Sequence, residues 1–297
     1  MNVTTHPAYL RARNRLVTEL RARLHVSLSR YPIVFLCGAA NSSARPYLRE
    51  YLSAHRPDWL VFLADDVWTY VEEYGALNSL DMEEELARLA DAVVIVVESP
   101  GTFAELGAFS ANEQLREKLL LILDESYENH PSFINTGPVH WVDQYSRIGK
   151  SVYCSLDSIS PSLSRVVMPL DDYLPSRRFD TITYEQMGEN PRHLLPLIAD
   201  LVSIVGPAEP REIRELLELV LDTKPEWRTD TLLGLAVSLA LVDRLPESRL
   251  YSRSIVDSKG SGLIRQTGFD IRRARARFIG AYRHMPGEWS RRFGVSE

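Results

Sequence analysis

Cysteine is scarce in this sequence of 297 residues, and that scarcity excludes two classes of protein. Cys37 and Cys154 are its two cysteines, with no Cys-x-x-Cys pair and no nearby pair of histidines. A small secreted domain held by disulfides needs more cysteines than this, and so does a structural zinc site. The seven histidines show no His-Glu-x-x-His spacing. We therefore expect two reduced thiols and no metal site.

Long hydrophobic runs are also missing. The apolar runs, of which residues 92–97 are an example, are far shorter than the ~20 residues that a membrane-spanning helix needs. The N-terminal residues are polar and basic, without the apolar stretch of a secretion signal. We expect no membrane span and a location in the cytoplasm.

Two nucleotide-binding motifs are absent as well. Gly38 resembles the first glycine of a phosphate-binding loop, but neither Gly-x-Gly-x-x-Gly nor Gly-x-x-x-x-Gly-Lys-Ser/Thr occurs. Redox use of a dinucleotide and Walker-type hydrolysis of a nucleoside triphosphate are therefore disfavoured.

Charge is unevenly distributed along the chain. The whole chain has a formal charge of −6, whereas residues 249–292 hold eleven Lys and Arg against three acidic residues, a charge of +8 that leaves −14 for the rest. An acidic body with a basic C-terminal third suggests that one part meets a polyanion, although a basic helix that is simply solvated explains the charge equally well.

Four short apolar runs, separated by helical patterns, indicate an α/β fold. The runs are residues 32–37, 59–63, 92–97 and 119–123. Continuous apolar strands are typical of a parallel sheet covered on both faces. We expect a Rossmann-like parallel sheet whose strand ends carry the polar residues of a binding site, followed by a mostly helical winged helix-turn-helix domain.

The expected domain boundaries follow the change of pattern. Residues 1–30 are expected to form an amphipathic helix packed on the first domain, residues 31–158 the sheet domain, and the proline-rich residues 159–191 an irregular linker. Residues 192–297 form the winged-helix domain. Its expected elements are helices at 193–205, 210–221 and 229–245, a hairpin of 249–257 with 262–266 around a tip at 258–262, and a basic helix at 269–283.

The densest chemical signal is the segment Glu98-Ser-Pro-Gly-Thr-Phe-Ala-Glu-Leu-Gly-Ala-Phe109, between a strand and a helix. Gly101 allows the positive φ of a tight turn, and Thr102 caps the helix and offers its hydroxyl to a phosphate or sugar. Glu105 then falls in the first helical turn, where a carboxylate can attack or stabilise the anomeric carbon of a ribosyl group. Alternatively, Glu105 only complements the helix dipole.

Other strand ends add polar groups to the same edge. Asp66 is a candidate for a ribose hydroxyl or base, Ser99 for an assisting contact, and the acidic helix at 81–85 for another carboxylate. Asn135 either reaches the pocket or makes the turn of its Asn-Thr-Gly-Pro segment. Each of these residues alone is more often a cap or a solvated group.

Together these motifs resemble the effector proteins of bacterial retron anti-phage systems. The similar segments are FLCG at 35–38, Asp65-Asp66, ESPGTFAELGAFS at 98–110, NEQLREKL at 112–119 and SFINTGPV at 132–139. Such effectors join a nucleoside deoxyribosyltransferase-like domain to a C-terminal winged-helix domain. The motif match spans residues 33–140. The second half of the chain is similar in the order of its expected elements more than in its amino-acid sequence.

The resemblance implies an N-glycosidase toxin that depletes a nucleotide, with NAD split into nicotinamide and ADP-ribose as the first choice. NAD is then a substrate, and no cofactor is expected. Glu105 matches the catalytic glutamate, and Asp81 or Glu83 a second carboxylate. The pocket edge matches Gly38, Asp66, Ser99, Gly101 and Thr102. Deoxyribosyltransferases proper carry an aspartate where this chain has Ser99, so water is the expected acceptor.

The resemblance also implies partners. In such systems a reverse transcriptase and its RNA-linked single-stranded DNA hold the effector until infection. We expect an oligomer, and contacts to nucleic acid or a partner from Arg265, Arg272, Arg273, Arg275 and Arg277. Two alternatives stay open: a nucleotide-sensing, DNA-binding regulator without catalysis, and a phosphoribohydrolase, which resembles this chain less because that group has a doubled glycine before the threonine.

Overall fold

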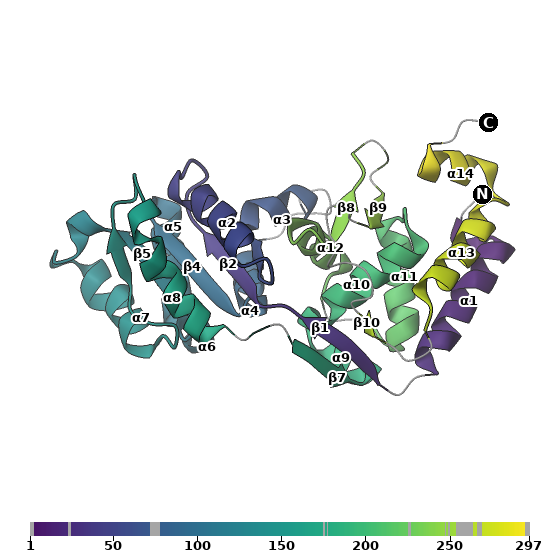
Figure 1. Cartoon of the computed structure of the whole chain (residues 1–297), viewed down its shortest axis with the longest axis horizontal. Coiled ribbons are helices and arrows are strands. Elements are labelled where there is room, and N and C mark those ends of the chain that lie inside the picture. Colours follow the sequence, from purple (N-terminus) through teal and green to yellow (C-terminus); the bar gives the residue numbers. More distant parts are fainter. Residues whose placement is uncertain are drawn as a thin grey trace. The chain divides into compact units, whose positions relative to one another are not determined.

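The computed structural model describes residues 3–22, 25–71, 78–174, 176, 178–224, 227–246, 248, 250–253, 264–265 and 269–294 (Figure 1). The chain divides into two compact units. We name them the sheet unit, which comprises Tyr31–Trp68 and Gly75–Arg178, and the helical unit, which comprises Met1–Arg30, Thr69–Tyr74 and Phe179–Glu297.

A five-stranded parallel sheet forms the centre of the sheet unit. Its strand order is β3-β2-β4-β5-β6, and neighbouring strands pair in register, for example Val34 with Ala92 and Val93 with Leu119. The strands are β2 (Ile33–Cys37), β3 (Leu60–Phe62), β4 (Ala92–Val97), β5 (Leu119–Asp124) and β6 (Val152–Cys154). The four apolar runs are confirmed as strands, and β6 is a fifth that the sequence analysis did not include.

This order creates a switch point between β2 and β4. From β2 the chain first adds β3 on one side, then crosses to add β4, β5 and β6 on the other. The loops after β2 and β4 therefore leave in opposite directions and open a crevice at the carboxyl ends of these strands, where ligands bind in open α/β sheets. The expected Rossmann-like parallel sheet is confirmed.

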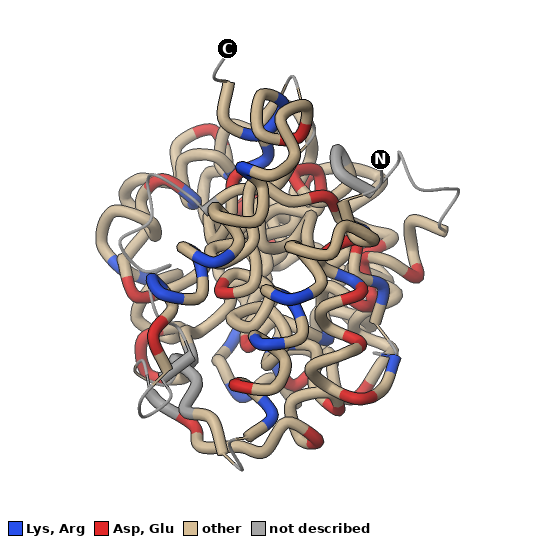
Figure 2. The backbone as a smooth tube through the Cα atoms, turned by 90° about the vertical axis from the view of Figure 1, so that its right-hand side faces the viewer, with Lys and Arg blue, Asp and Glu red and all other residues tan. Residues whose placement is uncertain are grey.

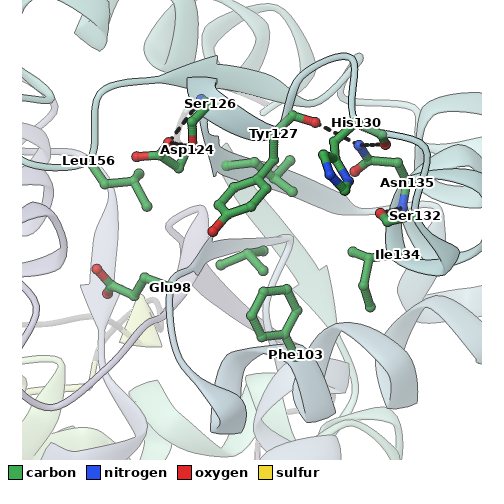
Figure 3. Close-up of a pocket in the computed structure, with 12 residues that line it drawn as sticks. Glu98, Phe103, Asp124, Ser126, Tyr127, His130, Ser132, Ile134, Asn135 and Leu156 are labelled. Atoms are coloured by element: carbon green, nitrogen blue, oxygen red, sulfur yellow. Dashed lines mark hydrogen bonds between the residues drawn. The ribbon is translucent and has the colours of Figure 1, made fainter.

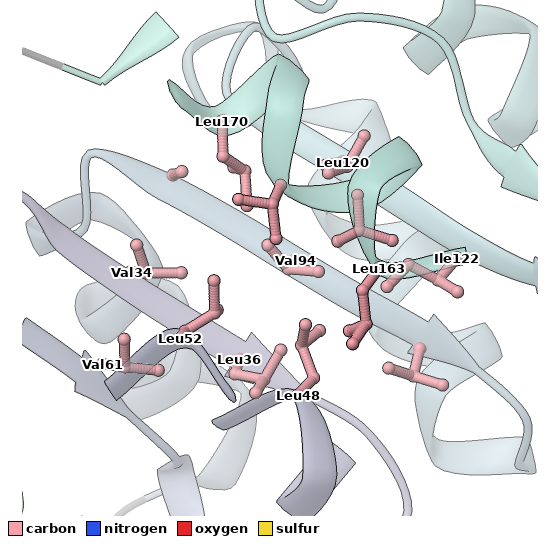
Figure 4. Close-up of a cluster of buried hydrophobic side chains, with 14 of the residues drawn as sticks. Val34, Leu36, Leu48, Leu52, Val61, Val94, Leu120, Ile122, Leu163 and Leu170 are labelled. Carbon is pink, nitrogen blue, oxygen red and sulfur yellow. The ribbon is translucent and has the colours of Figure 1, made fainter. Parts of the chain in front are cut away.

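Alternate residues of a strand point to opposite faces of the sheet, and apolar side chains on a face must be covered by helices. On one face, Leu48 and Leu52 of α2 (Ala44–His55) and Leu163 and Leu170 of α8 (Leu163–Tyr173) pack on strand residues such as Val94 (Figure 4). The sheet unit also contains α4 (Ser79–Leu89), α5 (Pro100–Ala111), α6 (Glu113–Arg116), a π-helical turn at Asn135–Val139 and α7 (His140–Tyr145). Helix α3 (Ala64–Val71) begins in the sheet unit, and its residues from Thr69 on belong to the helical unit.

The helical unit is built around α10, twelve of whose fifteen residues are buried. Its helices are α1 (Pro7–Arg21), α9 (Tyr184–Glu189), α10 (Pro191–Val205), α11 (Pro210–Leu221), α12 (Thr229–Ser238), α13 (Ile271–Tyr282) and α14 (Pro286–Phe293). Its strands are β1 (Val26–Arg30), β7 (Arg178–Ile182), β8 (Val242–Arg244), β9 (Tyr251–Arg253) and β10 (Ile264–Arg265). Among the described residues, no helix is both long and apolar enough to span a bilayer.

The N-terminal segment differs from its expected placement. Helix α1 ends at Arg21, residues 26–30 form β1, and α1 packs on α11 and α13 of the helical unit instead of on the sheet. The Tyr9 ring meets the edge of the Phe278 ring with 5.5 Å between centroids. Helical spacing of leucines predicted the helix but could not say which surface its apolar face would meet.

The expected irregular linker is largely regular structure. Helix α8 lies in the core of the sheet unit, and β7 and α9 follow it. Proline usually breaks a helix, so Pro169 argued against a helix here, whereas it lies inside α8.

Among the described residues of the expected hairpin, β9 pairs with β8 and β10 pairs with β1 instead of with each other. Residues 254–263, which include the predicted tip at 258–262, lie outside the described residues. The helix predicted at 229–245 ends at Ser238, because the chain reverses at Ala240, which has φ of 54°, and continues as β8. Helices α10, α11 and α13 are confirmed.

Candidate functional site

Glu105 lies at the β2 and β4 ends of the sheet, on the helix that follows β4. Helix α5 begins at Pro100, so Glu105 is in its second turn, and the expected first-turn position is wrong. A dipole effect is confined to the first turn, which weakens the explanation that Glu105 merely complements the helix dipole. Its Oε2 atom is buried without a hydrogen-bond partner among the described residues. Burying a carboxylate oxygen without a hydrogen-bond partner costs free energy, so such an oxygen is a candidate for a functional role.

Cys37, the last residue of β2, is the near neighbour of Glu105. Its side chain is buried and hydrogen-bonds with the Glu105 carboxylate. Burial, and then the charge of Glu105, raises the pKa of the Cys37 thiol well above its usual range. Cys37 is therefore a neutral thiol, which donates a hydrogen bond to the carboxylate.

Glu83 on α4 lies close enough to Glu105 for the charge of one carboxylate to act on the other. Burial, followed by the charges of Glu105 and Asp65, raises the pKa of Glu83 to about 7. Burial also raises the pKa of Glu105, but the Cys37 hydrogen bond and the Arg45 charge oppose that rise. Two such carboxylates ionise one after the other, and the contacts with Cys37 and Arg45 favour Glu105 as the group that carries the first negative charge. The alternative candidate, Asp81, is exposed.

Arg45 on α2 holds the neighbouring strand ends together. Its Nη1 atom donates to the Gly38 carbonyl oxygen at 2.9 Å, and its Nη2 atom to Asp65 at 2.6 Å. The arginine side chain is 7% exposed. A Cβ atom on Gly38 would lie 2.8 Å from the Arg45 Cδ atom, so the glycine is required by the packed arginine. Gly38 thus supports the site through Arg45.

Asp66, one residue further on, points elsewhere. It forms an ion pair with Arg49 at 2.7 Å. Its neighbour Asp65 is the carboxylate whose charge acts on both Glu83 and Glu105.

Ser99 and Thr102 form a capping box at the start of α5. The Thr102 Oγ1 atom accepts from the backbone N–H groups of Glu98 and Ser99, each at 2.9 Å, and donates to the Ser99 carbonyl oxygen. Because that hydroxyl is fully used and buried, it holds the turn instead of offering itself to a ligand. Gly101 is helical, so the expected positive φ is also wrong, and an added Cβ would make only an ordinary contact.

A pocket of about 580 Å³ opens on the β4 and β5 side of the same edge (Figure 3). Glu98 and Asp124 come from the strand ends, Phe103 from α5, and Tyr127 and Asn135 from the segment after β5. Asn135 lines the pocket and also makes the turn, since its Nδ2 atom donates to the Tyr127 and His130 carbonyl oxygens. Both readings of Asn135 therefore apply. Neither Glu83 nor Glu105 is among the residues that line this pocket.

Two of the predicted basic contact residues, Arg275 and Arg277, have partners within the helical unit. Arg275 donates to the carbonyl oxygens of Ser203 and Gly206 at the end of α10, and Arg277 pairs with Glu19 of α1 at 2.8 Å. Arg272 and Arg273 are exposed, whereas the side chain of Arg265 lies outside the described part. Figure 2 shows Lys and Arg interspersed with Asp and Glu. Arg275 and Arg277 thus help to hold α13 in place.

Sequence reasoning placed Cys37, Asp65, Glu98 and Asp124 among the polar groups at the strand ends but gave them no individual role. It missed Arg45 and Tyr127. Arg45 gave no signal, because its partners Gly38 and Asp65 lie far apart in the sequence. Among the described residues, no group of three or more His, Cys, Asp and Glu could hold a metal ion.

Comparison with known proteins gives consistent matches. Residues 41–244 match the model of the family described as "STM3845 retron effector protein". A protein of Escherichia coli named "Retron Ec73 putative ribosyltransferase/DNA-binding protein" is 28% identical over 229 residues, 70% of this chain and 72% of that protein. A second, "Retron Ec86 putative ribosyltransferase/DNA-binding protein", also from Escherichia coli, is 38% identical over 131 residues, 42% of either chain.

Proposed function

Since this chain belongs to the STM3845 retron effector protein family, we propose that it is the toxic effector of a retron anti-phage system and an N-glycosidase that acts in the cytoplasm. Its substrate in this proposal is a nucleotide, NAD first, which water splits into nicotinamide and ADP-ribose. The names of the two relatives point to chemistry at a ribosyl carbon, which an N-glycosidase also attacks.

The carboxylates of Glu105 and Glu83 carry the proposal. The ionised Glu105 faces C1′ of the ribosyl group, stabilises the positive charge that develops there as the bond to the base breaks, or bonds to C1′ transiently. The base leaves with the electron pair of the broken bond. Glu83, whose pKa is raised to about 7, can exchange a proton with water at the pH of the cytoplasm. Hydroxide from water ends on C1′, and one proton is released.

Water as the acceptor is supported by the role of Ser99. Transfer between bases in the deoxyribosyltransferases uses an aspartate at this position. Here the Ser99 side chain accepts from the Thr102 N–H group as the cap of α5 and has no carboxylate to offer a second base. Hydrolysis fits these residues better than transfer.

For the helical unit we propose a winged helix. The order α10, α11, α12, β8, β9 supports it, as does the bridge between Ala208, just before α11, and Tyr251 of β9. We propose that this unit meets the reverse transcriptase and its RNA-linked single-stranded DNA, that exposed Arg272 and Arg273 take part, and that the chain works as an oligomer. The relatives' names include DNA binding, which supports a nucleic-acid contact.

Release of nicotinamide from NAD, by the full chain alone and with its retron partners, is the test. We expect release by the wild type and by the matched control Glu113→Gln, which removes an exposed carboxylate of α6. We expect a loss of at least a hundredfold in Glu105→Gln, as for other groups that act directly in the transition state. Equal release by Glu105→Gln would refute the proposal. Binding of NAD without any turnover would favour the regulator.

A further inference from the structure

A groove of about 310 Å³ lies between α1 and α13, which pack side by side in the helical unit (Figure 1). It is lined by Ala8, Arg11, Ala12, Arg15, Arg277, Gly280, Ala281 and His284. We propose that this groove binds the phosphate backbone of double-stranded DNA without reading its sequence. The inference rests on the proposed nucleic-acid contact of the helical unit and adds a site that neither Arg272 nor Arg273 lines.

The groove has arginines on both helices and no acidic side chain among the described residues that line it. Arg11 is exposed and makes no ion pair within the described part of the chain. Glu19, outside the lining, pairs with Arg15 at 3.0 Å and with Arg277 at 2.8 Å. Three arginines and one glutamate give a net charge of 3 − 1 = +2, and the Arg15 side chain is still 58% exposed. The groove therefore attracts an anion.

Small residues keep the groove open between the arginines. A Cβ atom on Gly280 would meet no side chain and no backbone of another element within 4 Å. Arg11 and Arg15 are four residues apart, which places them about 6 Å apart along α1. Guanidinium groups on a rigid helix, beside open space, suit a ligand with regularly spaced phosphates, to which arginine can donate two hydrogen bonds at once.

Two features favour a duplex over other polyanions. No Phe, Tyr or Trp is among the described residues of the lining, whereas proteins that bind single strands stack the bases on aromatic rings. Binding by charge alone also increases with charge density, and duplex DNA carries one charge per about 1.7 Å, twice the density of a single strand. An extended acidic peptide carries at most one charge per about 3.4 Å. The duplex is thus the anion that the groove attracts most strongly.

Helix α12 explains why the contact is independent of sequence. In a helix-turn-helix the second helix, here α12 after α11, enters the major groove and contacts bases with polar side chains. Helix α12 has no Lys or Arg, and its residues Thr229 to Ala236 are buried. Its Asp230 pairs with Arg214 at 2.9 Å. Because α12 offers base edges no cation, the affinity must come from contacts with the backbone.

Fluorescence anisotropy with the full chain and labelled probes tests the groove. The probes are two duplexes of equal length and unrelated sequence, one of their single strands, and a polyglutamate peptide, each titrated at several salt concentrations. We expect equal affinity for the two duplexes and weaker binding of the single strand and the peptide. A single strand or a peptide that binds as tightly as the duplexes would overturn the proposal, and so would a preference for one duplex sequence.

Charge variants locate the contact. The double variant Arg11→Gln and Arg15→Gln removes two cations of the groove. We expect it to bind both duplexes about tenfold more weakly at about 0.1 M salt, and the slope of log Kd against log salt to fall by about two. Arg211→Gln, a change of an exposed arginine on α11 outside the lining, is the matched control and should keep the slope. Unchanged binding in the double variant would refute the groove.

Gly280 allows a second test in which all the arginines remain. Gly280→Glu adds a carboxylate to the groove, and Gly280→Gln adds a side chain of similar size without the charge. Both variants should fold, since Glu and Gln form helices more readily than Gly and the added Cβ has free space. We expect Gly280→Glu to bind the duplexes about tenfold more weakly than Gly280→Gln. Equal binding of the two would refute the groove even if the double variant does not fold.

These measurements also separate the groove from the proposed function. If the double variant Arg272→Gln and Arg273→Gln loses duplex binding while the groove variants keep it, the groove is wrong and the proposed contact through those two arginines stands. If the wild type binds no DNA, the groove and the proposed DNA contact fail together. Release of nicotinamide from NAD then still tests the enzyme, because it is measured without DNA binding.

Discussion

After the Cys37 hydrogen bond, the charge of Arg45 is the next feature that favours the ionised form of Glu105 against the effect of burial. Arg45 is nearly buried, it is paired with Asp65, and its charge lowers the pKa of Glu105 against the effect of burial. The Cys37 thiol acts in the same direction through a hydrogen bond. The arginine thus links the packing at Gly38 to the protonation of the proposed catalytic carboxylate.

Replacing Arg45 by methionine should move the acidic limb of the pH profile of kcat/KM to higher pH. Without the guanidinium, the pKa of Glu105 rises further, so the ionised form is lost at a higher pH than in the wild type. Arg45→Lys keeps a positive charge and should recover part of the shift. If both variants lose activity equally at every pH, Arg45 has only a structural role.

The protonation of Glu83 should make the free energy of unfolding depend on pH. Its folded pKa of about 7 lies above the usual value of 4.5, so the folded state binds the proton more tightly than the unfolded state does. The wild type should therefore lose stability as pH rises from about 4.5 to about 7. Glu83→Gln should show less of this loss and be more stable above that window by about 2 kcal/mol, a figure already reduced for solvent screening. Urea unfolding at several pH values measures it, and parallel curves for the two proteins would contradict it.

At the scale of the elements, the stability of α5 depends on the hydrogen bonds of its first turn. The Thr102 hydroxyl satisfies two backbone N–H groups in a buried place. Thr102→Val keeps the shape but leaves those groups unpaired, and should lower the free energy of unfolding by about 1–3 kcal/mol. Ser99→Ala should cost about 1 kcal/mol, as is usual for a lost N-cap. Urea unfolding compares the two, and no effect of Thr102→Val would show that water replaces the hydroxyl.

Elements with a strong local pattern could be predicted from the sequence. Every residue of β2, β3 and β4, and every residue of β5 before Asp124, is buried, so each of these strands stood out as a continuous apolar run. Strand β6 is three residues long, too short for a pattern. Helix α8 was hidden by its internal proline.

Pairing between distant elements could not be predicted. The sequence indicates strands at residues 251–253 and 264–265, but not that the first pairs with the preceding β8 and the second with the distant β1. In the site, the strand ends pointed to Glu105 and its surroundings. They could not show that Asp65 faces the site while Asp66 turns to Arg49, because a single residue changes the direction of the side chain.

For the whole molecule, the main unexpected feature is that the two ends of the chain belong to one unit. Helix α1 packs on α13, and Arg277 pairs with Glu19 across them. At the C-terminal end, Arg292 and Glu212 form a fully buried ion pair at 2.8 Å that attaches α14 to α11. The helical unit therefore cannot be complete until the last residues of α14 are present, whereas the sheet unit is nearly continuous in sequence.

Tyr9 provides the test of this organisation. It is 1% exposed and contacts the rings of Phe278 and Tyr282, so Tyr9→Ala leaves a cavity between α1 and α13 and should cost about 3–5 kcal/mol. Hydrogen exchange should show faster exchange in α13 and unchanged protection in β4, because the two elements belong to different compact units. Arg11→Ala, an exposed change on the same helix, should leave both unchanged. Equal loss of protection in β4 would mean that the units unfold as one, and that the N-terminal helix also supports the sheet that carries Glu105.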